Sequence, residues 1–180
     1  MKSKTRYAIL GMLSIEPMSG YDMRQAMKTS TAYFWSESDG QIYPTLAALQ
    51  KTKSIKVLPT KNISARDKKV YQITPQGRKE LQAWLVLEPE TQTVRSELML
   101  KLFFGANVAP VITREHIEAQ RYQTKTSLQQ LQQTRQQLMQ QEKNSPHLPY
   151  WLMSIDHGLR AGEARLEWCE ASIRTLAKME

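Results

Sequence analysis

The sequence contains a single cysteine, Cys169, and this scarcity excludes several kinds of protein. No intrachain disulfide can form, so a reducing cytoplasm is the expected compartment. No CxxC pair or Cys/His cluster offers ligands for zinc. The chain also lacks a run of about 18 apolar residues, the length that a membrane span requires. We therefore expect no metal, no cofactor and no transmembrane segment.

Sequence signatures of catalysis are missing as well. The histidines His116, His147 and His157 are not at ligand or dyad spacing, and there is no Gly-rich phosphate loop, GxSxG or HExxH. Cys169 lies on an apolar stripe, where a thiol is more often a core residue than a nucleophile. The sequence predicts no catalytic residue and no enzyme.

The positive charge of the chain is concentrated in its first half. Residues 1–88 carry 14 Lys/Arg against 7 Asp/Glu, whereas residues 89–180 carry 11 against 10. A basic half beside a nearly neutral half indicates that one domain meets a polyanion. The alternative is a basic surface that is merely solvated, so the residue pattern has to decide.

Residues 1–88 show the element order of a winged helix-turn-helix domain. Helices are predicted from about Tyr7 to Glu16, from Gly20 to Lys28 with Ser19 as N-cap, and over "GQIYPTLAALQ". Two alternating segments, 54–59 and 69–74, predict a β-hairpin. A further helix is expected to begin at Thr74-Pro75 and run through Leu85.

The third helix has an unusual pair of faces. Ile42, Leu46 and Leu49 form the stripe that we expect to be buried. The opposite face is small, which suits close approach to another surface: Gly40, Pro44, Ala47, Ala48 and Lys51. Pro44 is tolerated if the helix begins near Gly40 or Gln41, because first-turn amides lack intrahelical partners.

This helix is predicted to enter a DNA groove with its N-terminal end. Gly40 leaves backbone amides open to a phosphate, and Gln41, Tyr43 and Thr45 flank the small face, where they can reach bases or phosphates. The alternative is a capped core helix whose small residues are arranged by chance.

The basic hairpin is expected to contact phosphates through Lys61, Arg66, Lys68 and Lys69.

Four segments together resemble the PadR family of bacterial transcriptional regulators: "YAILGML", "MSGYDM", "GQIYPTLAALQK" and "KKVYQITPQGRKELQAWL". The second half is similar, through its length and "TVRSELMLKLFF", to the helical region of the longer members, which include AphA-type virulence activators. The resemblance implies a dimeric winged-helix protein on a palindromic promoter site, with Tyr21 and Tyr43 near the DNA backbone. One departure is Lys53-Ser54, where family members usually have a glycine.

Residues 89–180 are predicted to form a helical dimerisation domain. Helices are expected over 94–107, over 113–143, and after a break at 144–149. The last helix carries an apolar stripe at spacings of three and four: Leu152, Ile155, Leu159, Gly162, Leu166, Cys169, Ile173 and Leu176. We expect a two-fold mate to cover this stripe and Gly162 to permit a close helix crossing. An antiparallel helix of the same chain is the alternative.

Aromatic residues suggest a small effector. Tyr33, Phe34 and Trp35 form a run before the third helix, and Trp84 and Trp151 are expected near the domain junction. The simpler interpretation is that these rings pack the core and the interdomain seam. The hypothesis is a flat aromatic or phenolic ligand, as the resemblance to phenolic-acid-responsive members suggests.

Together these observations predict a mainly α fold with a small β-hairpin that binds double-stranded DNA as a homodimer. An effector-free architectural DNA-binding protein and a protein-interaction module with a basic face remain the alternatives.

Overall fold

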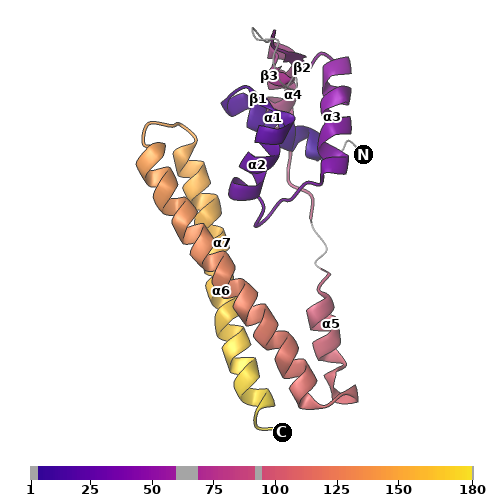
Figure 1. Cartoon of the computed structure of the whole chain (residues 1–180), viewed down its shortest axis with the longest axis vertical. Coiled ribbons are helices and arrows are strands. Elements are labelled where there is room, and N and C mark those ends of the chain that lie inside the picture. The colour runs from indigo at the N-terminus through magenta and orange to yellow at the C-terminus, as the bar shows by residue number, and fades with distance from the viewer. Residues whose placement is uncertain (1–3, 60–68, 92–94, 180) are drawn as a thin grey trace. The chain divides into compact units, whose positions relative to one another are not determined.

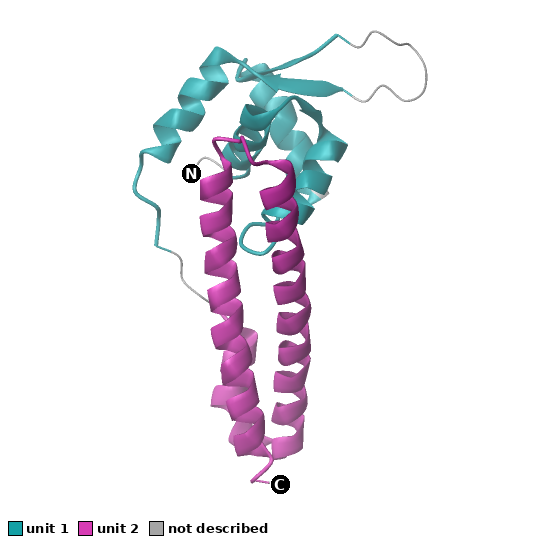
Figure 2. Ribbon diagram, turned by 90° about the vertical axis from the view of Figure 1, so that its left-hand side faces the viewer, with its two compact units in different colours: residues 1–91 teal, residues 92–180 magenta. Residues whose placement is uncertain are grey.

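The computed structural model describes residues 4–59, 69–91 and 95–179. The chain divides into two compact units, Met1–Thr91 and Gln92–Glu180, shown in teal and magenta in Figure 2. Helices make up most of both units, and the described strands form one small sheet in the first. The predicted fold class, mainly α with a small β-hairpin, is therefore confirmed.

The first unit contains the predicted helices and strands in the predicted order, together with one additional short strand. Its elements are α1 (Thr5–Ile15), β1 (Met18–Ser19), α2 (Gly20–Ser30), α3 (Asp39–Lys51), β2 (Ile55–Val57), β3 (Val70–Ile73) and α4 (Pro75–Leu85). The sheet order is β1-β3-β2 and both pairings are antiparallel. Strand β1 was not predicted, because two residues are too short to show an alternating pattern.

Side-chain caps fix the starts of two of these helices. The Ser19 hydroxyl accepts from the Asp22 amide at 3.2 Å, and the Thr74 hydroxyl accepts from the Gly77 amide at 3.2 Å. Between the helices and the sheet lies one apolar core with α1 and α3 at its centre. Its most deeply buried members are Ile9, Leu10, Leu13, Met23, Ile42, Leu46, Leu49 and Ile55.

The second unit is built around two long helices. Its elements are α5 (Glu97–Phe103), a 3-10 turn (Gly105–Asn107), α6 (Pro110–Gln141) and α7 (Leu148–Leu176). Helices α6 and α7 run side by side and antiparallel (Figure 1). The helix predicted over 94–107 ends at Phe103, and Pro110 and Pro149 lie in the first turns of α6 and α7, where the missing N–H costs nothing.

The close crossing predicted at Gly162 occurs within one chain. A Cβ atom added to Gly162 would lie 2.6 Å from Cδ2 of Leu128 in α6, so any larger residue would require the Leu128 side chain to shift. Ile155, Leu159 and Cys169 of α7 are buried in the same seam. Across the described ranges of the chain, no helix is both long and apolar enough to cross a membrane.

Candidate nucleic-acid interface

Helix α3 presents the two faces that its sequence predicts. Ile42, Leu46 and Leu49 are buried against the core, with at most 1% of their surface exposed. Their burial fixes the rotation of the helix. The opposite, small face is exposed at every predicted position: Gly40, Pro44, Ala47, Ala48 and Lys51. A surface could approach most of this face closely, because its one long side chain, Lys51, lies at the C-terminal end of the helix.

The first turns of α3 differ from the prediction in one respect. The helix begins at Asp39, so Pro44 is its sixth residue and lies beyond the first turn. The expected reason for its tolerance is therefore wrong. The missing amide leaves the Gly40 carbonyl without its usual i+4 donor, and this cost is moderated because both residues are exposed to solvent.

Two predicted base-reading residues make local hydrogen bonds in the free chain. The Gln41 side-chain oxygen accepts from the Ser38 amide at 3.2 Å and from the Ser38 hydroxyl at 3.1 Å. The Thr45 hydroxyl donates to the Gln41 carbonyl at 2.6 Å. Gln41 is exposed and Thr45 half-buried, so both would have to exchange these bonds to contact DNA.

Helices α2 and α3 meet at a glycine. A Cβ atom added to Gly20 would lie 2.9 Å from Cε1 of Tyr43 and 3.2 Å from Cδ1 of Leu46. Tyr43 therefore rests on the start of α2, with 52% of its surface exposed. Tyr21, the next residue of α2, is 48% exposed, so the two tyrosines expected near DNA both lie on the surface.

The C-terminal end of α3 is closed without the usual glycine. The Ser54 amide donates to the Leu49 carbonyl at 3.0 Å, and the Lys53 amide donates to the Gln50 carbonyl at 3.0 Å. This is the Schellman pattern, and it places Lys53 in the left-handed region with φ of 57°. The departure from the family pattern thus keeps the geometry and puts a strained lysine in the glycine position.

The N-terminal end of α4 binds the carbonyls that follow α3. The Thr74 hydroxyl donates to the Lys53 and Ser54 carbonyls at 2.7 and 3.0 Å, and the Gln76 side-chain Nε2 donates to the Thr52 carbonyl at 3.0 Å. Gly77 allows the two segments to touch, because an added Cβ would lie 2.1 Å from the Ser54 carbonyl oxygen. The end of α3 is therefore fixed to the helix that follows the wing.

A largely buried ion pair lies beside the same junction. The Arg6 guanidinium donates to both carboxylate oxygens of Glu80 and also to the Thr52 and Ser54 hydroxyls, at 3.0 and 3.1 Å. The hydrogen bond to Glu80 raises the pKa of Arg6 above its ordinary value. Sequence reasoning missed this pair. The available signal was Glu80 on the same helical face as the buried Gly77 and Leu81.

The basic wing can be placed only in part. Lys69, which directly precedes β3, and Lys51, the last residue of α3, are both exposed. Lys61, Arg66 and Lys68 lie outside the described residues, so their proposed phosphate contacts stay predictions.

The aromatic residues expected around an effector are in three places. Trp84 stacks on Tyr7 in the first unit, with ring centroids 4.6 Å apart, and Trp151 stacks on His147 in the second unit. The Tyr33 ring packs edge-on against Phe34. Phe34 and Trp35 of this set line a cavity in the first unit.

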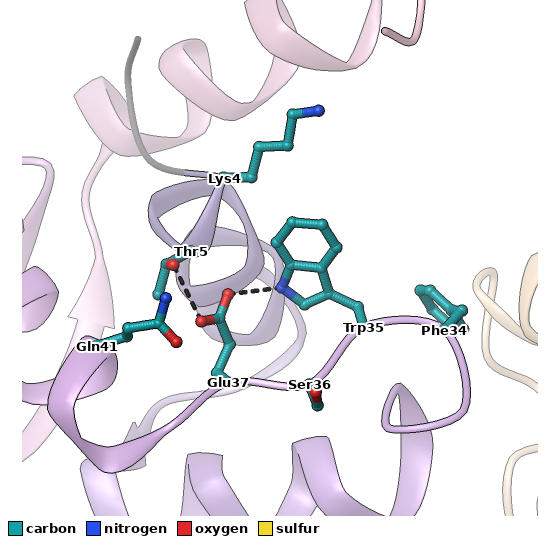
Figure 3. Close-up of a pocket in the computed structure, with 7 residues that line it drawn as sticks. All are labelled: Lys4, Thr5, Phe34, Trp35, Ser36, Glu37 and Gln41. Atoms are coloured by element: carbon teal, nitrogen blue, oxygen red, sulfur yellow. Dashed lines mark hydrogen bonds between the residues drawn. The ribbon is translucent and has the colours of Figure 1, made fainter. Parts of the chain in front are cut away.

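That cavity has a volume of about 380 Å³ and opens beside the start of α3 (Figure 3). Its walls come from the start of α1 and from the segment before α3: Lys4, Thr5, Phe34, Trp35, Ser36, Glu37 and Gln41. Glu37 accepts from the Trp35 indole at 2.6 Å and from the Thr5 hydroxyl at 3.0 Å. The cavity thus combines aromatic faces with a lysine and an engaged carboxylate.

The predicted dimerisation residues are partly used within the chain. Ile155 and Leu159 are 2% and 6% exposed and leave no surface for a partner. The other four are half-buried: Leu152, Leu166, Ile173 and Leu176. Leu176 borders an apolar cavity of about 650 Å³ that lies among the end of α7, the start of α6, α5 and the 3-10 turn. Nearby, α5 and its C-cap expose Leu100, Phe103 and Phe104 at 60%, 82% and 57%.

The described part of the chain holds no group of three or more His, Cys, Asp or Glu side chains suited to a metal ion. Burial raises the pKa of Cys169, so its thiol stays protonated at neutral pH.

Two family profiles together match most of the chain. The profile of the transcriptional regulator PadR-like family matches residues 9–83. The profile described as virulence activator alpha C-term matches residues 94–177. The first match spans α3 and the sheet, and the second spans α5 to α7.

Full-length relatives agree with these matches. The negative transcriptional regulator PadR of Bacillus subtilis is 29% identical over 178 residues, covering 96% of this chain and 97% of that protein. The crystal structure of Bacillus subtilis PadR in complex with operator DNA matches with a TM-score of 0.82 and 30% identity, covering 97% of this chain and 99% of that one. Its complex with p-coumaric acid matches with a TM-score of 0.74 and 30% identity, covering 96% and 98%.

Proposed function

Because the chain belongs to the PadR-like family of transcriptional regulators, we propose that it binds a palindromic promoter site as a homodimer and controls transcription there. The observation that carries this proposal is the exposed, small face of α3 beside Gln41, Tyr43 and Thr45. A bound complex of Bacillus subtilis PadR with operator DNA supports it. The site of action is then the cytoplasm, where chromosomal DNA lies.

In this proposal α3 enters the major groove with its N-terminal end. Gln41 and Thr45 read base edges, while Tyr21 and Tyr43 lie near the backbone on either side. Phosphates are contacted by Lys51 and by the basic residues of the hairpin, Lys61, Arg66, Lys68 and Lys69. These contacts supply affinity that does not depend on sequence. Two copies of α3 on one dimer would read half-sites about one helical turn apart.

The test separates base readout from phosphate contact. Operator fragments are selected from a random-sequence duplex library, and affinities for operator and random DNA are then compared over a range of salt concentrations. Lys51→Ala and Lys69→Ala should weaken both affinities alike and lower the salt slope by about one unit each. Gln41→Ala should instead change preference at particular base pairs. Equal losses on both DNAs for both groups would contradict readout by α3.

The proposed dimer uses the second unit. One chain leaves an apolar surface exposed to water, which is unfavourable. This surface comprises the half-buried stripe residues of α7, the apolar cavity beside Leu176 and the exposed face of α5. Phe103→Asp adds a charge at a residue that is 82% exposed, so it should yield folded monomers in sedimentation. Tyr150→Asp is the matched control. Tyr150 lies in the first turn of α7, at the opposite end of that helix from Leu176, so this variant should leave the dimer intact. A dimeric Phe103→Asp variant would contradict the use of α5.

An effector is the last part of the proposed function. We infer a small aromatic acid in the cavity lined by Lys4, Phe34 and Trp35, where the rings offer faces for stacking and the Lys4 ammonium, paired with the exposed Glu90 carboxylate at 3.0 Å, exchanges that partner for the acid. The complex of Bacillus subtilis PadR with p-coumaric acid supports this ligand class. Titration with p-coumaric acid should quench tryptophan fluorescence and weaken operator binding, and Trp35→Leu should abolish both effects. No response across a panel of aromatic acids would favour the effector-free alternative.

A further inference from the structure

Two consecutive residues at the start of α1 bind both ends of α3. Thr5 donates to Glu37, which lies two residues before the first residue of α3. Arg6 donates to Thr52 and Ser54, which follow the last residue of α3. Helix α3 has 13 residues and is about 20 Å long, so these contacts lie at opposite ends of it.

The contact at the C-terminal end is held by charge. The side chains of Arg6 and Glu80 are 15% and 18% exposed, so neither charge is fully solvated. Glu80 Oε2 also accepts from the Ser54 hydroxyl at 2.9 Å, and the Thr52 and Ser54 hydroxyls are 3.1 Å apart. Because a largely buried charge that loses its partner is costly, Arg6 keeps one orientation, and the C-cap of α3 is tied to it.

The contact at the N-terminal end is held by a shared carboxylate. Thr5 is buried, and its hydroxyl binds one oxygen of Glu37 while the Trp35 indole binds the other. Figure 3 shows the Glu37 carboxylate between these two donors. The N-cap residue of α3, Ser38, follows Glu37 directly, so the start of the helix is fixed to the same turn of α1.

Holding a helix at both ends determines its tilt as well as its position. Apolar packing of Ile42, Leu46 and Leu49 fixes which face of α3 is buried, but such packing is non-directional and tolerates small shifts along the helix axis. Hydrogen-bonded groups at both ends remove that freedom. Reading base edges requires side chains to be placed within about 0.5 Å and 10–20°.

We propose that Thr5 and Arg6 are positioning residues for DNA recognition: they hold α3 in the orientation that reads sequence, without touching DNA themselves. We call these two residues the brace. The proposal rests on the proposed function, in which α3 enters a DNA groove. It predicts that weakening the brace reduces the preference for operator over random DNA. Binding to random DNA depends on the positive charge of the protein and not on the exact position of α3.

The first test is Arg6→Lys. Lysine keeps the charge of the domain, but its ammonium cannot reproduce the planar fork that joins Glu80, Thr52 and Ser54. Affinity for the selected operator should fall about tenfold, as for the loss of a hydrogen bond to a charged group. Affinity for random duplex of equal length should stay within about twofold, since charge dominates it. Arg160→Lys, in an exposed ion pair with Asp156, is the matched control and should change neither.

The ratio of the two affinities separates positioning from stability. A variant that is only less stable has a smaller folded fraction, which lowers both affinities by the same factor and leaves their ratio unchanged. Chemical denaturation of each variant gives that folded fraction. Thr5→Val removes the hydroxyl at nearly constant volume and should also lower the ratio of operator affinity to random-DNA affinity. Thr5→Ser keeps the hydroxyl and should leave this ratio at its wild-type value.

The outcomes are distinct. A lower ratio for folded Arg6→Lys and Thr5→Val, with Thr5→Ser and Arg160→Lys unchanged, supports the brace. If Arg6→Lys does not fold, the Thr5 pair decides alone. Unchanged ratios in the folded variants, with a selective wild type, overturn the brace while leaving the proposed function intact. A wild type that shows no preference for any duplex contradicts the proposed function itself.

Discussion

Replacing Lys53 by glycine should stabilise the first unit, although it removes a side chain. Lys53 has φ of 57°, the left-handed region, where an L-residue is disfavoured by roughly 1–2 kcal/mol. Glycine adopts this conformation freely but adds freedom to the unfolded chain, which offsets about 0.5–1 kcal/mol. The net gain in the free energy of unfolding should be about 0.5–1 kcal/mol. The hydrogen bonds at the junction involve only the backbone of Lys53, so they remain.

The matched control is Lys51→Gly, two residues earlier. Lys51 is exposed and is the last residue of α3, so glycine there loses helix propensity and gains nothing. The free energy of unfolding should fall by about 0.5 kcal/mol. Both variants remove one positive charge at neighbouring surface positions, so electrostatic effects on stability largely cancel in the comparison.

The assay uses tryptophan fluorescence in urea. Of the four tryptophans, Trp35 and Trp84 belong to the first unit, so replacing Trp151 and Trp168 by Phe confines the signal to that unit. Lys53→Gly should raise the transition midpoint without changing its slope. In thermal unfolding the gain corresponds to a rise of roughly 4 °C. If Lys53→Gly destabilises as much as Lys51→Gly does, the left-handed strain assigned to Lys53 is absent.

Three further predictions concern close approaches and burial. Gly77→Ala should cost more than about 3 kcal/mol, because the new Cβ meets the backbone oxygen of Ser54, and urea unfolding of the first unit measures this loss. Gly162→Ala should cost only about 1 kcal/mol, because the Leu128 side chain can shift and alanine favours helix; circular dichroism in urea measures it. Cys169 is fully buried and its pKa is raised, so DTNB should label it only as the helices separate. Because its unfolded-state thiol ionises first, stability should fall as pH rises above about 8.5.

The faces of the individual helices were predictable from sequence, because burial follows a helical period. Ile42, Leu46 and Leu49 are buried as expected, and the small residues opposite them are exposed. The N-caps Ser19 and Thr74 were equally predictable, since each signal lies within four residues.

Features that depend on distant residues were not predictable in the same way. The pairing of Arg6 with Glu80 joins residues 74 positions apart, and no local pattern identifies such a partner. Likewise, a regular apolar stripe on α7 shows that a partner exists but not which one. The sequence favours a second chain as this partner, whereas Ile155 and Leu159 pack within this one.

The pairing of β1 with β3 bears on how the two units fold. In the first unit, Met18 pairs with Tyr71, and Arg6 binds Glu80. The first unit therefore cannot complete its fold until almost all of its residues have left the ribosome. In the second unit, the principal contact joins α6 to the next helix along the chain across a short connection. Local contacts form quickly and distant ones slowly. The half of the chain that is synthesised first is therefore the half whose folding is limited by chain length, and the later half can collapse as a hairpin as soon as α7 emerges.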